Sequence, residues 1–334
     1  MVVLSLFDGM SCGQIAFDKL DIKFDGVKNK YFASEIKKSA IKVTKHNYPN
    51  TIHIGDVTKV SYSNGVLYTE NGEYEVGEID YLIGGSPCQD FSCAKLQAAK
   101  DKYGLEGDKS KLFYEYLRLL KEINPKYFLL ENVRMKEDSK KQLDKYLGVE
   151  GRFINSIDFS FQNRPRFYWT NMDILDYEPL SISFQDYKDT DEDYCDKFKV
   201  KPTPSRIKMW NNGKGESSFL RCCANVTNSD KVYCLTRKQD RNPNSGLVEH
   251  KDFCRYLTQR ELEAAQTVPR GYTDILSYSQ AQDVLGDGWT VDVIKHILKS
   301  SLVESKKATK TEEVIKIEKV KLGKCEVEQL KFCI

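Results

Sequence analysis

The first 170 residues alternate short runs of β-branched and aromatic residues with longer stretches of helical periodicity. The clearest helix spans residues 111–123, where apolar side chains recur every three or four positions. Two Asn-Gly pairs predict a small hairpin over residues 60–77. The expected strands are residues 2–7, 31–34, 51–54, 81–83, 127–130, 154–159 and 166–170. Strands that alternate with helices predict an α/β fold with a doubly wound, mostly parallel sheet.

The alternation stops after residue 171, and the next 80 or so residues are rich in Pro, Asn, Gly and charge. Order returns at Thr258 and Glu261, which have the spacing of a helix capping box, and in an amphipathic helix expected over residues 289–298. We therefore expect a main domain, a small inserted domain and a charged tail of no assigned role: residues 1–171 plus 255–302, residues 172–254, and residues 303–334.

The formal net charge of +2 hides a strongly basic segment. Residues 197–260 hold fourteen Lys and Arg against five Asp and Glu, whereas residues 186–196 hold six acids and one Lys. A local basic surface of this strength favours a partner with a phosphate backbone. A solvated surface without a partner is the alternative that charge alone leaves open.

Membrane, disulfide-stabilised and zinc-binding proteins do not fit this sequence. No run approaches about 18 apolar residues and no cleavable leader precedes the first strand, so we expect a cytoplasmic protein. The ten cysteines include no C-x-x-C pair and no zinc-finger spacing, which predicts free thiols and no metal site. Abundant Lys, Asn, Ile and Tyr indicate an AT-rich genome, that of a bacterium or a phage.

One cysteine occupies a position of a different kind. Cys88 lies in the loop Gly-Gly-Ser-Pro-Cys-Gln that directly follows the expected strand 81–83. In doubly wound sheets, ligands bind at the loops that follow the carboxyl ends of strands. Because Pro87 restrains the backbone beside the thiol, Cys88 is a candidate nucleophile; an inert buried thiol is the alternative.

Two further strand boundaries carry charged side chains. Glu131 follows the apolar strand 127–130, and Arg164 and Arg166 flank the start of the last strand. Each alone is typical of a solvated strand end. Because parallel strands end at one edge of a sheet, the three loops together predict an active site that contains Cys, Glu and Arg.

Together these segments resemble the motif series of the DNA (cytosine-5-)-methyltransferases. The resemblance covers residues 1–171 and 255–300 and rests on the Pro-Cys-Gln loop, the Glu-Asn-Val strand end and the Gln-x-Arg-x-Arg run, in the family's order. It implies a Rossmann-like fold, methylation of carbon 5 of cytosine with S-adenosylmethionine, and a target-recognition domain at residues 172–254. Trp289 stands where most bacterial members have Asn, and here the sequence resembles eukaryotic de novo methyltransferases.

The resemblance also implies a cofactor site. Phe7 is implied to stack on adenine, Glu35 to bind the ribose hydroxyls and Asp56 to bind the adenine amine. Glycines in the first loop let backbone N–H groups approach a ligand carboxylate. The other implied cofactor contacts are Asp8, Gly9, Gly13, Val57, Pro87 and Trp289.

The implied reaction begins when the Cys88 thiolate attacks carbon 6 of a flipped-out cytosine, which makes carbon 5 nucleophilic. Glu131, protonated, is implied to bind N3 and the exocyclic amine. Arg166 is implied to hold O2, and Arg164 to support the loop or a phosphate. Double-stranded DNA is the implied partner, and a cognate restriction endonuclease is compatible with the resemblance. The expected DNA contacts are Gln89, Ser92, Lys95, Arg237, Lys238 and Arg241.

Two other functions stay open on the sequence. An RNA cytosine-5 methyltransferase would share the scaffold and the chemistry, although the basic insert favours DNA. A catalytically silent DNA-binding member would be free to lose Cys88, Glu131 and Arg166, and all three are present.

Overall fold

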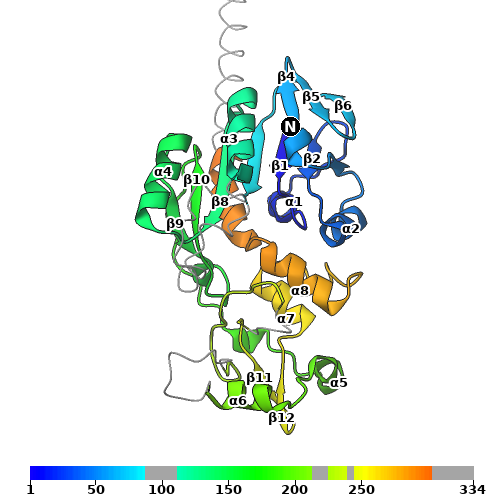
Figure 1. The fold of residues 1–334 in the computed structure, drawn as a ribbon, viewed down its shortest axis with the longest axis vertical. Helices are drawn as coiled ribbons and strands as arrows, with labels where there is room; N and C mark the ends of the chain where they lie inside the picture. Colours follow the sequence, from blue (N-terminus) through cyan, green and yellow to red (C-terminus); the bar gives the residue numbers. More distant parts are fainter. Residues whose placement is uncertain (87–110, 213–224, 239–243, 303–334) are drawn as a thin grey trace, which may run out of the picture.

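A seven-stranded sheet forms the core of the chain (Figure 1). The computed structural model describes residues 1–86, 111–212, 225–238 and 244–302. The strands of the sheet are β1 (Val2–Leu6), β2 (Lys30–Ser34), β3 (Ile52–His53), β7 (Tyr81–Gly85), β8 (Tyr127–Val133), β9 (Arg152–Asn155) and β10 (Pro165–Thr170). Their order is β3-β2-β1-β7-β8-β10-β9, and only β10 runs antiparallel to its neighbours. The predicted doubly wound, mostly parallel, Rossmann-like sheet is confirmed.

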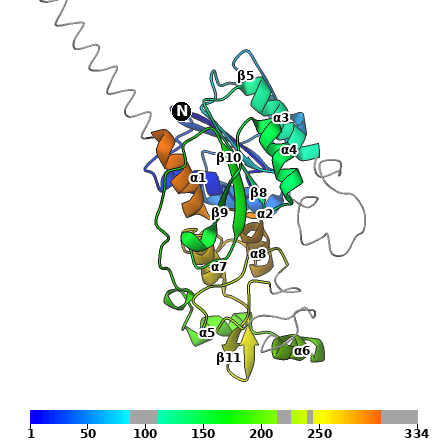
Figure 2. The ribbon, with the colours of Figure 1, turned by 90° about the vertical axis from the view of Figure 1, so that its left-hand side faces the viewer.

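Successive residues of each strand pack on opposite faces of the sheet, as the period of two requires. Leu4 and Phe32 belong to one hydrophobic core, and their neighbours Val3 and Tyr31 belong to the other. Because both faces are covered, the strands read as nearly continuous apolar runs. The covering helices are α3 (Lys111–Ile123) and α4 (Glu137–Leu147) on the first face, and α1 (Cys12–Asp18), α2 (Lys38–Asn47) and residues 291–302 on the second (Figure 2).

The expected hairpin over residues 60–77 is instead a three-stranded meander. The chain reverses twice, at Asn64-Gly65, which both take the positive φ angles of a tight turn, and at Glu70-Asn71, after which Gly72 begins the third strand with a positive φ. The strands of the meander are β4 (Ser61–Ser63), β5 (Val66–Thr69) and β6 (Gly72–Glu75).

Several other element ends differ from the expected ones. The strands expected over residues 81–83 and 127–130 continue to Gly85 and Val133, so Glu131 lies within β8 and not after it. The strand expected over residues 154–159 ends at Asn155, because its side chain accepts from the N–H of Ile157 and starts the short helix η2 (Ser156–Asp158). The last helix begins at residue 291, two residues later than expected. The capping box of Thr258 and Glu261 is confirmed at the start of α7 (Gln259–Ala265).

The second lobe, residues 172–254, lies below the carboxyl edge of the sheet in Figure 1. Its elements are η3 (Phe184–Asp186), α5 (Glu192–Cys195), η4 (Asp196–Phe198), α6 (Pro204–Asn212) and β11 (Val248–His250), which pairs with β12 (Phe253–Arg255). Trp210, Leu247 and Cys254 contribute to a small core of this lobe. Phe184 and Val232, however, belong to the same core as the sheet. The domain boundary after residue 171 therefore stays a prediction.

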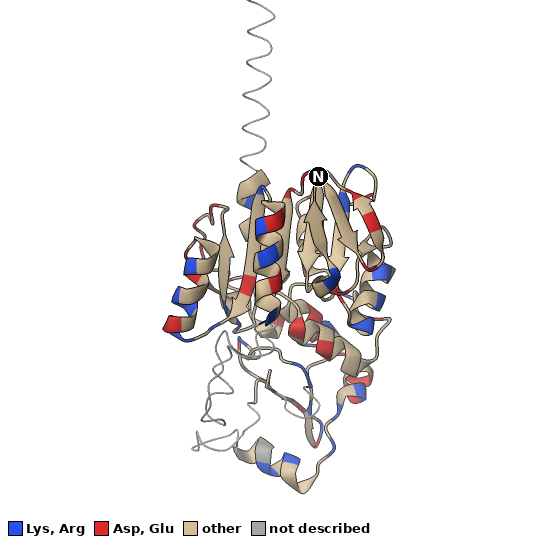
Figure 3. Cartoon of the chain, turned by 45° about the horizontal axis from the view of Figure 1, so that its top comes forward, with Lys and Arg blue, Asp and Glu red and all other residues tan. Residues whose placement is uncertain are grey.

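Figure 3 marks the basic residues on the ribbon of the second lobe, and several of their side chains have partners within the protein. Lys199 and Lys251 both form ion pairs with Asp196, and the ammonium group of Lys231 donates to three backbone carbonyls. The excess of basic residues in the sequence therefore overstates the charge that is free to meet a partner. Among the described residues, no helix is long and apolar enough to cross a membrane.

A buried ion pair joins the end of the second lobe to α7. Arg255 donates to both oxygens of Glu261 over 2.8 Å, and both side chains are almost fully buried. Glu261 also accepts from the backbone N–H of Asp189 over 2.8 Å and from that of Thr258 over 2.7 Å. The carboxylate is thus shared by three segments of the chain, and removing its charge would leave the Arg255 guanidinium buried without its partner.

We expect Glu261→Gln to lower the free energy of unfolding by about 3 kcal/mol, because a buried guanidinium loses its counter-charge. Urea denaturation, followed by circular dichroism, measures this loss. Glu192→Gln, a change of the same kind at an exposed position of α5, is the control and should cost well under about 1 kcal/mol. Equal stability of the two variants would contradict the importance of the pair.

Candidate active site

The carboxyl ends of β1, β2, β7 and β8 surround a cleft of about 330 Å³. The chain reverses its direction of winding between β1 and β7, and such a switch point is where doubly wound sheets bind ligands. The predicted site residues that line the cleft are Phe7, Asp8, Gly9, Glu35, Asp56, Val57, Glu131, Arg164, Arg166, Arg237 and Trp289. Pro87, Cys88, Gln89, Ser92, Lys95 and Arg241 lie outside the described residues.

The loop between β1 and α1 forms one wall of the cleft. Phe7, Gly9 and Ser11 all have positive φ angles, 55°, 60° and 60°, so the backbone turns sharply twice. A left-handed Phe is costly and persists only where the surroundings hold it. The N–H of Asp8 donates to the carbonyl of Ser34, which fixes this loop to the end of β2.

Asp8 points into the protein beneath this loop. Its carboxylate accepts from the hydroxyl of Tyr31 over 2.8 Å and from that of Ser11. Burial raises the pKa of Asp8 to about 6, and this effect outweighs the hydrogen bonds from Ser11 and Tyr31, which lower it. Asp8 therefore supports the loop from below.

Glu35 and Asp56 are held by backbone groups. Glu35 accepts from the N–H groups of Gly9, Ile36 and Lys37 over 2.7–2.8 Å, and Asp56 accepts from the N–H of Thr58 over 2.9 Å. The N–H of Asp56 in turn donates to Glu70 of the meander over 2.8 Å. Charge-assisted bonds of this kind fix a carboxylate in place.

Two residues at this end of the cleft were not among the predicted site residues. Ile36 lines the cleft although its side chain is 70% exposed, and an apolar residue directly after a strand-end acid is the signal that could have shown it. Glu70 lies in the meander, and nothing in the sequence indicated its approach to the loop of Asp56. Gly55 permits this approach, because a Cβ there would lie 1.8 Å from Oε1 of Glu70.

Gly13 and Lys238 do not line the cleft. A Cβ on Gly13 would lie 2.4 Å from the Ile83 side chain and 2.8 Å from the Tyr31 hydroxyl, so this glycine lets α1 pack closely on the sheet. The backbone N–H of Lys238 donates to Asp283 of α8 (Tyr278–Asp287) over 3.2 Å.

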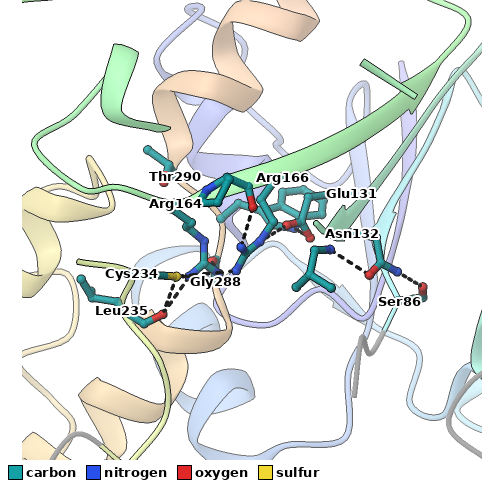
Figure 4. Close-up of polar contacts among 12 residues, drawn as sticks. Ser86, Glu131, Asn132, Arg164, Arg166, Cys234, Leu235, Gly288 and Thr290 are labelled. Atoms are coloured by element: carbon teal, nitrogen blue, oxygen red, sulfur yellow. Dashed lines mark hydrogen bonds and ion pairs between the residues drawn. The ribbon is translucent and has the colours of Figure 1, made fainter. Parts of the chain in front are cut away.

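At the other end of the cleft, the Glu131 carboxylate has a donor on each oxygen. Nε of Arg166 lies 2.8 Å from Oε1, and Nε1 of Trp289 donates to Oε2 over 3.1 Å. The next residue, Asn132, donates to the buried hydroxyl of Ser86 over 3.1 Å (Figure 4). Ser86 is the last described residue before the loop that contains Cys88, so β8 fixes the point at which that loop begins.

Arg164 lies beside Arg166, but its guanidinium contacts backbone (Figure 4). It donates to the carbonyls of Leu235 over 2.9 Å, Gly288 over 2.8 Å and Gly286 over 3.2 Å. The side chain is 3% exposed. These bonds connect the residue before β10 to the second lobe and to the end of α8. Arg164 is therefore placed to support these two segments of backbone.

Two cysteines near the cleft differ in their ionisation. Cys12 lines the cleft, but burial raises the pKa of its thiol to about 12, so it stays protonated. The thiol of Cys234 lies 3.5 Å from Nη1 of Arg164 and 3.9 Å from Nη2 of Arg166. Burial opposes ionisation of Cys234, but the charges of the two arginines outweigh it and lower its pKa. The sequence did not indicate Cys234.

Arg237 reaches the mouth of the cleft from the second lobe. Its Nε lies 3.7 Å from Asp287 and 3.9 Å from Asp283, and the side chain is 43% exposed. Gly286 permits this approach, because a Cβ there would lie 2.6 Å from the backbone of Thr236. Arg237 therefore lies near two acids of α8 and still exposes part of its side chain to solvent.

The buried Asp8 gives a testable dependence of stability on pH. Its pKa is raised in the folded state, so its contribution to stability is fully present below about pH 4 and is lost as pH rises through about 6. Asp8→Asn should therefore gain stability over the wild type by up to about 3 kcal/mol between pH 4 and pH 7. Urea denaturation over this range measures the difference. For the exposed Asp173→Asn we expect a stability difference from the wild type that does not change with pH. The same constant difference for Asp8→Asn would contradict the raised pKa of Asp8.

Comparison with known proteins gives consistent results. The sequence profile of a family described as C-5 cytosine-specific DNA methylase matches residues 1–149. The type II methyltransferase M1.ScrFI of Lactococcus lactis subsp. cremoris is 29% identical over 92% of this chain and 79% of its own length. The type II methyltransferase M.NlaIV of Neisseria lactamica is 34% identical over 50% of this chain, but only 40% of its own length.

Among solved structures, the methyltransferase EhMeth of Entamoeba histolytica has a TM-score of 0.66 over 90% of this chain and 97% of its own, at 14% identity, which supports the fold. The family profile spans the strand ends that carry Phe7, Glu35, Asp56 and Glu131. The similarity to M1.ScrFI extends over nearly the whole chain. Residues 1–149 therefore carry a C-5 cytosine-specific DNA methylase domain, and over most of its length the chain is similar to a type II methyltransferase.

Proposed function

We propose that the chain methylates a cytosine flipped out of a specific sequence in double-stranded DNA, with Cys88 as the nucleophile and S-adenosylmethionine as the methyl donor. The observation that carries this proposal is the Glu131 carboxylate, held by Arg166 beside the cleft on the strand next to β7. The loop of Cys88 begins directly after β7. An acid, a guanidinium and a thiol loop thus share one edge of the sheet.

The residues around the cleft fit S-adenosylmethionine. Phe7, Ile36 and Val57 provide apolar surface for a flat base, and the carboxylates of Glu35 and Asp56 can accept from hydroxyl and amino groups. Gly9 has open space where a Cβ would stand, which leaves the backbone accessible to a ligand. When bound, this cofactor supplies an electrophilic methyl group.

Cys88, Glu131 and Arg166 each have one role toward the cytosine in the proposed reaction. The Cys88 thiolate adds to carbon 6, and electrons move through the ring toward N3, where protonated Glu131 shares its proton. Arg166 donates to O2 of the base and, through its bond to Glu131, keeps that acid in place. After carbon 5 is methylated it loses its proton to a base, and the thiolate leaves as the double bond forms again.

Other residues support this site. Arg164, whose guanidinium contacts backbone carbonyls, acts as a positioning residue, and Asn132 with Ser86 holds the start of the Cys88 loop. The second lobe is the proposed target-recognition domain, residues 172–254, with Arg237 at its boundary with the cleft. The relatives named above are type II methyltransferases, which supports a cognate restriction endonuclease as a further partner.

Wild-type chain should form a covalent adduct with DNA that contains 5-fluorocytosine, because fluorine blocks the final loss of the carbon 5 substituent. The adduct should survive denaturing electrophoresis. Cys88→Ala should form no adduct and transfer no methyl group, while cofactor and DNA affinities change less than about threefold, below about 0.7 kcal/mol. Normal turnover by Cys88→Ala would refute the mechanism, and methylation of transfer RNA but not of duplex DNA would favour the RNA alternative.

Glu35→Ala should weaken S-adenosylmethionine binding by about tenfold or more, since a hydrogen bond to a charged group contributes roughly 1.5–3 kcal/mol. Calorimetric titration without DNA measures this change directly. Glu73→Ala, at an exposed position of β6, is the control and should bind the cofactor like the wild type. Unchanged affinity in Glu35→Ala would place the cofactor elsewhere.

A further inference from the structure

The indole ring of Trp289 lies between the ends of the strands that form the cleft. Its Nε1 donates to Oε2 of Glu131 over 3.1 Å, and Trp289 and Glu131 are each 8% exposed. A Cβ on Gly85 would lie 2.8 Å from Nε1 of Trp289 and 3.1 Å from Oε2 of Glu131. The hydrogen-bonded pair therefore packs directly on the last residue of β7, where only glycine leaves enough room.

The loop on both sides of Trp289 is anchored. The carbonyl of Gly288 accepts from Arg164 over 2.8 Å and from Gln266 over 3.1 Å, and the hydroxyl of Thr290 donates to Gln266 over 2.8 Å. The side chains of Arg164, Gln266 and Thr290 are all buried. The position of the indole is thus fixed by the backbone on either side of it.

The two donors to Glu131 differ in origin and act on different oxygens. Arg166 belongs to β10 and contacts Oε1, whereas Trp289 follows α8 and contacts Oε2. The terminal torsion of a glutamate side chain has a broad energy minimum, so one donor leaves the plane of the carboxyl group free to rotate. Two donors from separate elements fix that plane. One oxygen can then carry the proton for N3 of the base, while the other accepts from the exocyclic amine.

We propose that Trp289 is a positioning residue that orients the carboxyl group of Glu131 toward the cytosine; this inference rests on the proposed function of Glu131. The indole N–H is a donor only, so it keeps Oε2 as an acceptor and cannot exchange roles with the substrate. Phenylalanine at this position retains most of the packing but cannot donate. If Trp289 contacted only the cofactor, Trp289→Phe would weaken cofactor binding and leave the rate at saturation unchanged.

Trp289→Phe should lower the single-turnover rate of methyl transfer about 10- to 100-fold, since misplacement of a reacting group by about 1 Å can cost 100-fold. The dissociation constants for S-adenosylmethionine and for DNA should change less than about threefold. Trp169→Phe is the matched control, because it removes an indole N–H that donates over 2.6 Å to another carboxylate, Asp144 of α4, and neither residue lines the cleft. That variant should keep the wild-type rate.

The partner of Trp289 can be identified with a double-mutant cycle. In a Glu131→Ala background, Trp289→Phe should cause no further loss of rate, because a residue that acts through Glu131 has nothing left to orient. General damage to the fold would instead add to the effect of Glu131→Ala. If Trp289→Phe does not fold, Gly85→Ala should show the same selective loss of rate, since its Cβ would displace the hydrogen-bonded pair.

Two results would overturn the inference about Trp289 without affecting the proposed function. One is a Trp289→Phe enzyme with the wild-type rate, while Glu131→Gln is impaired. The other is a Trp289→Phe enzyme that binds the cofactor weakly but reaches the wild-type rate at saturation, which would make Trp289 a cofactor contact only. A wild-type chain without adduct formation or methyl transfer would instead overturn the proposed function, and this inference with it.

Discussion

The buried guanidinium of Arg164 joins the sheet to the two segments that close the cleft. Its bonds reach Leu235 in the second lobe and Gly286 and Gly288 at the end of α8. A buried positive charge is costly unless its N–H groups are satisfied, so these carbonyls must stay where they are. Trp289 follows Gly288 directly. The position of Trp289, and with it the proposed orientation of Glu131, therefore depends on a cation that contacts backbone carbonyls.

The sheet could be predicted because its signals are local. Alternating strand and helix patterns, two Asn-Gly pairs and one capping box each depend on residues close together in the sequence. The acids and arginines at strand ends could be predicted for a related reason, since the topology of a parallel sheet brings strand ends to one edge. Most of the described site residues, Glu35 and Glu131 among them, do line the cleft.

What the sequence could not show depends on contacts between distant segments. Trp289 and Glu131 are 158 residues apart, and their contact requires that Gly85 has no side chain. The ion pairs of the basic segment with acids elsewhere in the chain could not be predicted for the same reason. Acids outside the basic segment, such as Glu261 and Asp287, neutralise arginines within it. Strand 154–159 was predicted too long because a single Asn side chain turned the chain at its end.

Within the described part of the chain, Arg164 donates almost entirely to backbone carbonyls, and Cys234 is the one side chain among its acceptors. A carbonyl is the same whichever residue carries it, so this contact sets little requirement on the amino acids of the second lobe. Leu235 can therefore be replaced by another residue without removing this contact between the second lobe and the catalytic sheet. For a lobe proposed to read DNA, a change of target sequence then need not alter the contact at Arg164.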